Sequence, residues 1–230
     1  GLVGSEMCIR DRYDRHWYRK NYDREAVHAK WHELSEKESE AHSDESLSKE
    51  TLNDDYQQLF VMMVFDHVQH VLECIRKKTQ PEPLRLLLLG TAGSGKTRAV
   101  QTALQEIQRT LAAAGLPLEV DQRHFVRVAA PTSSAAFNLR FHATTVHRLI
   151  RWFSPPFFRE IRDDKALHEL QKHLRSTQLI FLDEVSMIGR QMMGRIDSRF
   201  EQAKGYQNQR NDSIGGVSCV AVGDLSLIHI

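Results

Sequence analysis

Cysteine is scarce in this chain of 230 residues, which has only three, at positions 8, 74 and 219. Three scattered thiols are too few for a disulfide framework or a zinc site, so a reducing, intracellular setting is expected. Long apolar runs are also missing, because none approaches the roughly 20 residues that a membrane-spanning helix requires. No signal-peptide pattern opens the chain, and a soluble protein with no membrane partner is predicted.

An excess of either charge is lacking too. The chain has 31 basic and 30 acidic residues, a net charge of +1, so any claim of nucleic-acid binding must come from local features. With 41% apolar residues, the chain can bury one sizeable α/β core plus appendages, or at most two small domains.

Residues 1–12 and 225–230 fit no expected element and resemble translated sequencing-adapter read-through, so both are interpreted as artefactual tails of a fragment. Residues 13–50 form an extension and linker, helical or disordered. Its first part interleaves aromatic with basic residues, which suits either a stacking platform for single strands or an amphipathic helix packed on a neighbour. The remaining 51–224 are expected to form one α/β lobe.

The strongest motif begins where an apolar run, 84–89, meets a glycine-rich turn. A continuous apolar run is typical of a parallel strand buried on both faces. The turn satisfies G-x-x-x-x-G-K-[ST] and precedes a helix, since apolar residues recur at positions 100, 104, 107 and 111. Such a phosphate loop predicts a site for ATP and Mg²⁺ at a helix N-terminus. The predicted ligands are Gly90, Thr91, Ala92, Gly93, Ser94, Gly95, Lys96 and Thr97, with Lys96 on the phosphates and the Thr97 hydroxyl on the metal.

A second apolar strand, 178–182, ends in Asp183 and Glu184. At this place in a phosphate-loop ATPase, Asp183 serves Mg²⁺ and Glu184 the attacking water. A helix is predicted over 186–203, with Met187, Met192, Met193, Ile196 and Phe200 in the core. A further apolar strand is predicted over 217–222.

Two other segments add to this pattern. A helix over 51–78 is predicted to bury Val61, Phe65, Val68, Leu72 and Ile75 on one face. A strand over 124–130 leads into Pro131, Thr132 and a short helix containing Asn138, followed by His147. The polar groups after this strand suit either phosphodiester contacts or an ordinary capped turn.

Together these motifs resemble the first ATPase lobe of the Pif-type helicases, which are RecD-like members of superfamily 1. The pieces that carry the resemblance are Gly90–Thr97, Ala130–Asn138, Thr145–His147, Leu182–Met187 and Val222–Asp224. The resemblance implies a RecA-like fold and ATP-driven 5′-to-3′ movement on single-stranded DNA, in nucleus or mitochondrion. It also implies that Lys96, Asp183 and Glu184 are catalytic, that Gln57 contacts adenine, and that Pro131, Thr132, Asn138 and His147 contact DNA.

The chain departs from the family pattern at several positions. Ser133 and Ser134 replace Thr-Gly, Ala143 replaces Gly, and Tyr56 stands where the adenine-sensing glutamine normally lies, one residue before Gln57. Leu227 takes the place of a glutamine that senses the γ-phosphate, and the second RecA-like lobe is missing. A fragment of this kind is expected to bind ATP, hydrolyse it poorly and unwind nothing.

Two other hypotheses remain open. The chain could be a phosphate-loop ATPase of another kind, in which 131–147 is structural. It could also be a one-lobed, non-enzymatic nucleotide-binding module.

Overall fold

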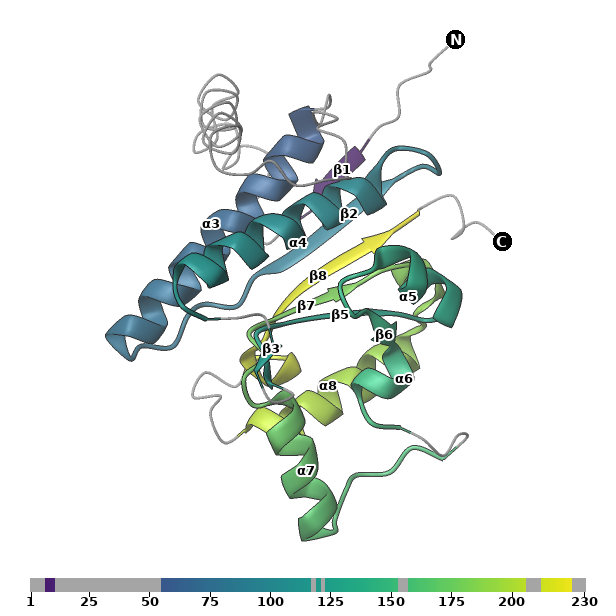
Figure 1. Cartoon of the computed structure of the whole chain (residues 1–230). Coiled ribbons are helices and arrows are strands. Elements are labelled where there is room, and N and C mark those ends of the chain that lie inside the picture. Colours follow the sequence, from purple (N-terminus) through teal and green to yellow (C-terminus); the bar gives the residue numbers. More distant parts are fainter. Residues whose placement is uncertain are drawn as a thin grey trace.

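The computed structural model describes residues 7–10, 55–116, 119–120, 123–152, 157–205 and 212–224. The predicted extension over 13–50 and the tail over 225–230 lie outside these residues. The described part confirms the α/β prediction, with a mostly parallel sheet between two layers of helices (Figure 1).

The central sheet has six strands in the order β1-β2-β8-β7-β5-β6. All neighbours pair in parallel except β1, which pairs antiparallel with β2 at one edge. A separate antiparallel pair is formed by β3 and β4. The strands are β1 (Met7–Arg10), β2 (Arg85–Gly90), β3 (Glu119–Val120), β4 (Arg123–His124), β5 (Val126–Ala130), β6 (Thr144–Thr145), β7 (Leu179–Leu182) and β8 (Ser218–Gly223).

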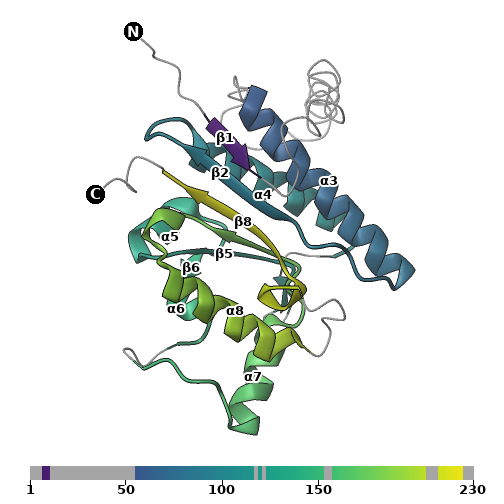
Figure 2. The same cartoon turned by 180° about the vertical axis from the view of Figure 1, so that it is seen from behind.

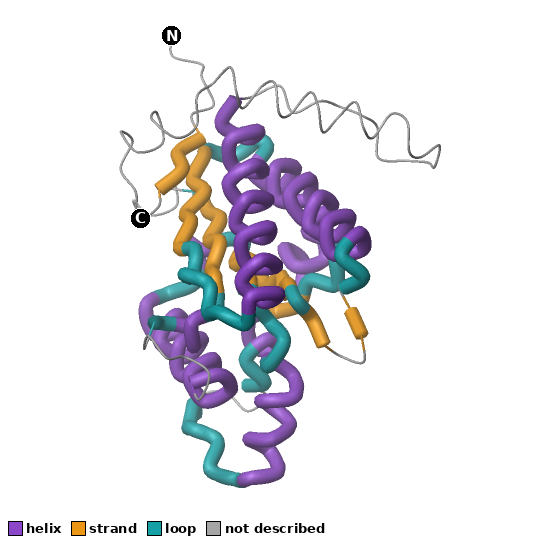
Figure 3. The backbone as a smooth tube through the Cα atoms, turned by 90° about the vertical axis from the view of Figure 1, so that its left-hand side faces the viewer, coloured by secondary structure: helices purple, strands orange, loops and turns teal. Residues whose placement is uncertain are grey.

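Helices cover both faces of this sheet (Figures 1 and 2). On one face α3 and α4 lie side by side, and on the other lie α6, α7 and α8; Figure 3 shows the long α3 running along the sheet. The helices are α3 (Asp55–Lys77), α4 (Lys96–Ala113), α5 (Ser133–Leu139), α6 (Val146–Leu149), α7 (Asp164–Leu174) and α8 (Arg190–Lys204), with the short 3₁₀ helices η1 (Val185–Met187) and η3 (Ile214–Gly216).

The sheet divides the apolar core into two clusters. One lies under α3 and α4 and includes Phe60, Leu104 and Ile107; the other lies under α6 to α8 and includes Ile180 and Phe200. Every residue of β5 and of β7 is buried. Burial on both faces explains why β7 is a continuous apolar run and why β5 departs from one only at Arg127, whose guanidinium bonds Thr177.

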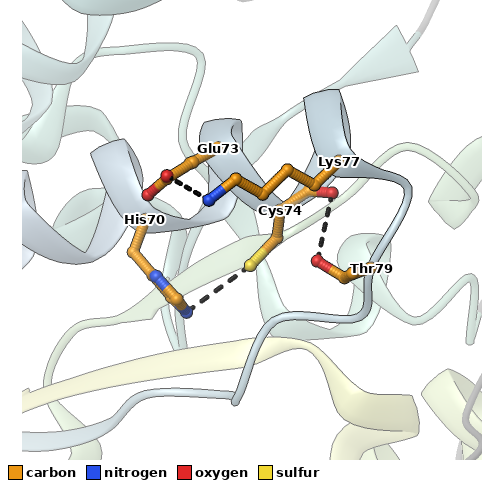
Figure 4. Close-up of polar contacts among 5 residues, drawn as sticks. All are labelled: His70, Glu73, Cys74, Lys77 and Thr79. Atoms are coloured by element: carbon orange, nitrogen blue, oxygen red, sulfur yellow. Dashed lines mark hydrogen bonds and ion pairs between the residues drawn. The ribbon is translucent and has the colours of Figure 1, made fainter.

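The end of α3 has a defined stop, and Figure 4 shows there the Thr79 hydroxyl donating to the Cys74 carbonyl. Lys78 adopts a left-handed conformation with φ 55°, and the Thr79 N–H donates to the Cys74 carbonyl at 2.9 Å. This 6→1 bond is the Schellman motif, here with lysine where glycine is usual. In the last turn of α3, Lys77 forms an ion pair with Glu73 at 2.5 Å. The chain then passes through Pro81 and Pro83 before β2.

The structure corrects four expectations. Residues Met7–Arg10 form β1, so the prediction that residues 1–12 fit no element is wrong for these four residues. The physical reason is that the edge of β2 has unpaired backbone N–H and C=O groups, which β1 satisfies by pairing with it. The helix predicted from 186 begins only at Arg190, because the chain first forms η1. Met187, on η1, is therefore 59% exposed instead of buried. Ile75, near the end of α3, is 43% exposed.

The helix α7 was not predicted at all. Its N-cap is Asp163, whose carboxylate accepts from the Ala166 N–H at 2.8 Å. Leu167, Leu170 and Leu174 face the core at helical spacing. The aspartate before a leucine periodicity was the signal available in the sequence.

None of the helices among the described residues is both long enough and apolar enough to cross a membrane.

His67 on α3 is expected to make stability fall in mild acid. Its Nε2 lies 2.7 Å from the Ser218 hydroxyl, which also accepts from the Leu84 N–H at 3.1 Å. Burial, and then the neighbouring His70 and Arg85, lower the pKa of His67 from 6.5 to about 4. Because the unfolded chain takes up this proton near pH 6.5 and the folded chain only near pH 4, stability is lost as the pH falls through that window.

The loss attributable to His67 is about 3 kcal/mol between pH 7 and pH 4. Urea unfolding across this range should show a shallower pH dependence for His67→Gln than for the wild type. His168→Gln, at an exposed position on α7, is the matched control and should keep the wild-type curve. Identical pH dependence in wild type and His67→Gln would refute the assignment.

Candidate functional site

The predicted nucleotide site and the predicted DNA segment meet at one edge of the sheet. Because β2, β8, β7 and β5 run parallel, their carboxyl ends lie on the same side. The phosphate loop follows β2, the two carboxylates follow β7, and the turn of Pro131 and Thr132 follows β5. In Figure 1 the loop between β2 and α4 lies on the side to which the β8 arrow points.

The phosphate loop uses its glycines for two different reasons. Gly93 and Gly95 both have φ 79°, a left-handed conformation that other residues adopt only with strain. Gly90 is required for space, since a Cβ there would lie 2.5 Å from the Ser94 Oγ. The rim of the loop, Thr91 to Gly93, is exposed, while Ser94 is only 4% exposed. An open rim on a tightly folded base suits an anion that arrives from solvent.

Lys96 is held by the loop that it follows. Its ammonium donates to the carbonyls of Gly90 and Thr91, at 2.8 Å in each case. An ammonium has three N–H donors, so these two bonds leave capacity for an anionic acceptor. The cation is thus fixed at the mouth of the loop, where phosphates of a nucleotide would meet it.

The N-terminus of α4 carries no side-chain cap and no acidic residue in its first turn. By contrast, Thr132 caps α5 and Asp163 caps α7. The first N–H groups of a helix and its dipole attract negative charge, and in α4 no side chain of the helix supplies it. This N-terminus is therefore suited to a phosphate.

Asp183 and Glu184 are oriented by the backbone. The Asp183 N–H donates to the Ala129 carbonyl at 2.9 Å, which fixes the backbone at the end of β7. Burial raises the pKa of the Asp183 carboxyl, the charge of Glu184 adds to this, and Lys96 opposes it. Lys96 therefore lies within electrostatic reach of Asp183, as one shared site requires.

Glu184 has φ 50° and ψ 43°, a left-handed conformation rare for a residue with a side chain. Such strain costs of order 1–3 kcal/mol and is often found at functional positions. The turn is fixed on its far side by the Met187 N–H, which donates to the Glu184 carbonyl at 2.9 Å.

The donor set fits magnesium. Thr97 offers an exposed hydroxyl and Asp183 a partly buried carboxylate, both hard oxygen ligands. Mg²⁺ usually takes one or two such protein groups and completes its shell with water and substrate phosphates. An ion held there would neutralise negative charge on a bound phosphate.

Comparison with known proteins places this geometry in a family. The family model described as an AAA domain matches residues 72–206, more than half of the chain. The chain belongs to this family.

Solved structures similar to this AAA domain include Pif1 helicases. Unliganded Pif1 from Bacteroides sp. is 22% identical, with 70% of this chain and 31% of that chain covered and a TM-score of 0.41. Bacteroides Pif1 in complex with ADP-AlF4 is 22% identical, with 79% and 33% covered and a TM-score of 0.44. Pif1 from Candida albicans is 20% identical, with 69% and 32% covered and a TM-score of 0.44. The chain thus spans about a third of the length of these proteins. No curated protein matches the chain.

The AAA domain places the predicted DNA-contacting residues on the same edge but gives two of them internal partners. The Thr132 hydroxyl accepts from the Ala135 N–H at 3.2 Å, and the His147 ring stacks on Trp152 with centroids 4.9 Å apart. The Asn138 side chain is exposed, and the Asn138 backbone carbonyl accepts from the Gln101 side-chain amide at 3.1 Å. Pro131 is partly buried at the start of the turn.

Other features of this edge were missed from the sequence. Phe137, beside Asn138 on α5, is 83% exposed. Three consecutive residues after α5, Arg140 to His142, have positive φ. Ala143, where the Pif-type pattern has glycine, is not among them, so alanine fits there without backbone strain. Exposure of a large aromatic residue has no sequence signal, because it depends on what the fold places around it.

Gln57, predicted to contact adenine, lies against the phosphate loop. Its Nε2 donates to the Ser94 carbonyl at 3.0 Å. Its role as an adenine contact stays a prediction.

Substituting Gly90 should destabilise the AAA domain, because a Cβ there meets Ser94. We expect Gly90→Ala to lower the unfolding free energy by about 1–3 kcal/mol, and Ser94→Ala in that background to restore part of the loss. The matched control is Gly194→Ala in α8, where nothing lies within 4 Å of a new Cβ. This control should instead stabilise by about 0.5–1 kcal/mol. Urea unfolding measures all three variants, and equal effects of Gly90→Ala and Gly194→Ala would contradict the packing argument.

Proposed function

We propose that this chain is the first ATPase lobe of a Pif-type, 5′-to-3′ DNA helicase, which binds and hydrolyses ATP with Mg²⁺ and contacts single-stranded DNA. One observation carries the proposal: the uncapped N-terminus of α4, with its phosphate loop, shares a sheet edge with Asp183, Glu184 and the turn before α5. A motor must couple ATP hydrolysis to movement on DNA, and a nucleotide site and a DNA contact on the same edge of the sheet would allow this coupling.

In this proposal the nucleotide site divides its work among four side chains. Lys96 binds the phosphates, and Thr97 and Asp183 would hold Mg²⁺. Glu184, on the strained turn after β7, orients and deprotonates the attacking water. ATP hydrolysis at full rate would further require an arginine finger, which the proposed second RecA-like lobe supplies.

The DNA contact is proposed for Pro131, Thr132, Asn138 and His147. Its support is their position after β5 and β6, next to the strands that carry the nucleotide site. Asn138 offers an exposed amide and α5 an N-terminus, groups that suit phosphates and sugars.

A phosphate-loop ATPase without DNA binding is the second candidate, and one observation favours it. Thr132 and His147 both have structural partners, the first as the cap of α5 and the second in a stack with Trp152. Under this second candidate, the segment 131–147 has only structural roles, in capping α5 and in packing against Trp152.

Lys96→Ala should abolish nucleotide binding while leaving the fold near intact. The reason is that Lys96 supplies the positive charge at the mouth of the loop, while its ammonium makes two hydrogen bonds, to the carbonyls of Gly90 and Thr91. Isothermal titration with ATP and Mg²⁺ checks the affinity, and circular dichroism the fold. Lys165→Ala, at an exposed lysine of α7, is the matched control. Unchanged ATP affinity in Lys96→Ala would refute the phosphate-loop assignment.

The combined change of Thr132, Asn138 and His147 to alanine should weaken single-stranded DNA binding by at least about tenfold, since each lost polar contact is worth roughly 0.5–1.5 kcal/mol. Fluorescence anisotropy with a labelled oligonucleotide measures this, and ATP titration should remain unchanged. Thr132→Ser keeps the α5 cap and is the control for folding. If the unsubstituted chain binds no single-stranded DNA and the triple variant only loses stability, the second candidate is correct. DNA binding that survives the triple change would instead refute the contacts assigned to these three residues.

A further inference from the structure

The first turn of α3 contacts the phosphate loop through one side chain. Gln57, third residue of α3, donates its amide Nε2–H to the carbonyl of Ser94 at 3.0 Å. The two residues are 37 positions apart in the chain. The bond is therefore tertiary, and it joins a helix outside the loop to the loop backbone.

Gly95 makes room for this contact. A Cβ at position 95 would lie 2.5 Å from the Gln57 Nε2 and 3.4 Å from its amide carbon. The glycine has a second reason to be there, its φ of 79°. One missing side chain thus permits both the turn of the loop and the approach of the glutamine.

The contact completes a pair of restraints on the loop. Lys96 bonds the carbonyls of Gly90 and Thr91 at the start of the loop, and Gln57 bonds the carbonyl of Ser94 near its end. Ser94 immediately precedes Gly95, the N-cap of α4. Fixing its carbonyl fixes the peptide planes that lead into the helix N-terminus, where N–H groups must converge on an anion.

We propose that Gln57 is a positioning residue for the phosphate loop, which acts on triphosphate binding through the Ser94 carbonyl and not by reading the adenine base. This inference rests on the proposed nucleotide site. It assigns Gln57 a different role from the adenine contact that the family resemblance implies. A bond to the loop backbone contributes equally to every ligand that the loop holds, whatever base it carries.

The test compares ligands with and without adenine. ATP, GTP and inorganic triphosphate, each with Mg²⁺, are titrated calorimetrically into the full chain and into Gln57→Ala. We expect affinity to fall about 3- to 10-fold for all three ligands, the equivalent of one lost hydrogen bond. Gln57→Glu should lose more, because its carboxylate faces the Ser94 carbonyl without a donor and repels the phosphates.

Gln101→Ala is the matched control. Gln101 also donates its amide to a backbone carbonyl, that of Asn138 at 3.1 Å, but away from the phosphate loop. It should bind all three ligands as the wild type does. A structural role for Gln57 confined to α3 would lower the melting temperature without changing any of the three affinities.

The outcomes distinguish the positioning role of Gln57 from the proposed nucleotide site. A loss in Gln57→Ala that is confined to ATP, or no loss for any ligand, overturns the positioning role while the nucleotide site stands. Failure of the unsubstituted chain to bind any of the three ligands overturns the proposed nucleotide site, and this inference with it.

Discussion

Parallel pairing of four buried strands is the constraint on which the rest of the molecule depends. The strands β2, β8, β7 and β5 run in the same direction and pair through backbone hydrogen bonds. Their carboxyl ends must therefore lie at the same edge of the sheet. Segments that are almost 100 positions apart in sequence, at Gly90 and Asp183, are brought to that edge by the register alone. Helices on both faces then bury the strands, which is why most of their residues are apolar.

The phosphate loop gains its shape from three sources that act on different residues. Gly93 and Gly95 permit the left-handed backbone. The Lys96 ammonium bonds the Gly90 carbonyl at the start of the loop, and Gln57 of α3 bonds the Ser94 carbonyl near the end of the loop. Such a loop meets its ligand with little left to reorganise, and a preorganised site loses less conformational entropy on binding. The loop therefore depends on α3 as well as on its own sequence.

The sequence predicted what local physics determines. The phosphate loop, the strand before Asp183 and the helix after Thr97 each follow from a short pattern whose chemistry is complete within it. Contacts between distant segments were not accessible: nothing near Gln57 indicates that it meets Ser94, and nothing near Met7 indicates that it pairs with β2. The break between η1 and α8 was missed for a related reason, because the apolar spacing of Met187, Met192 and Ile196 suits a continuous helix and only the turn fixed by Glu184 interrupts it.

That turn also bears on how the two carboxylates act. Glu184 has a left-handed backbone, and the Met187 N–H donates to its carbonyl at the start of η1. The directions in which the Asp183 and Glu184 side chains leave the end of β7 are therefore set by one backbone turn. A change that relaxes the strained Glu184 backbone would alter the position of one carboxylate relative to the other.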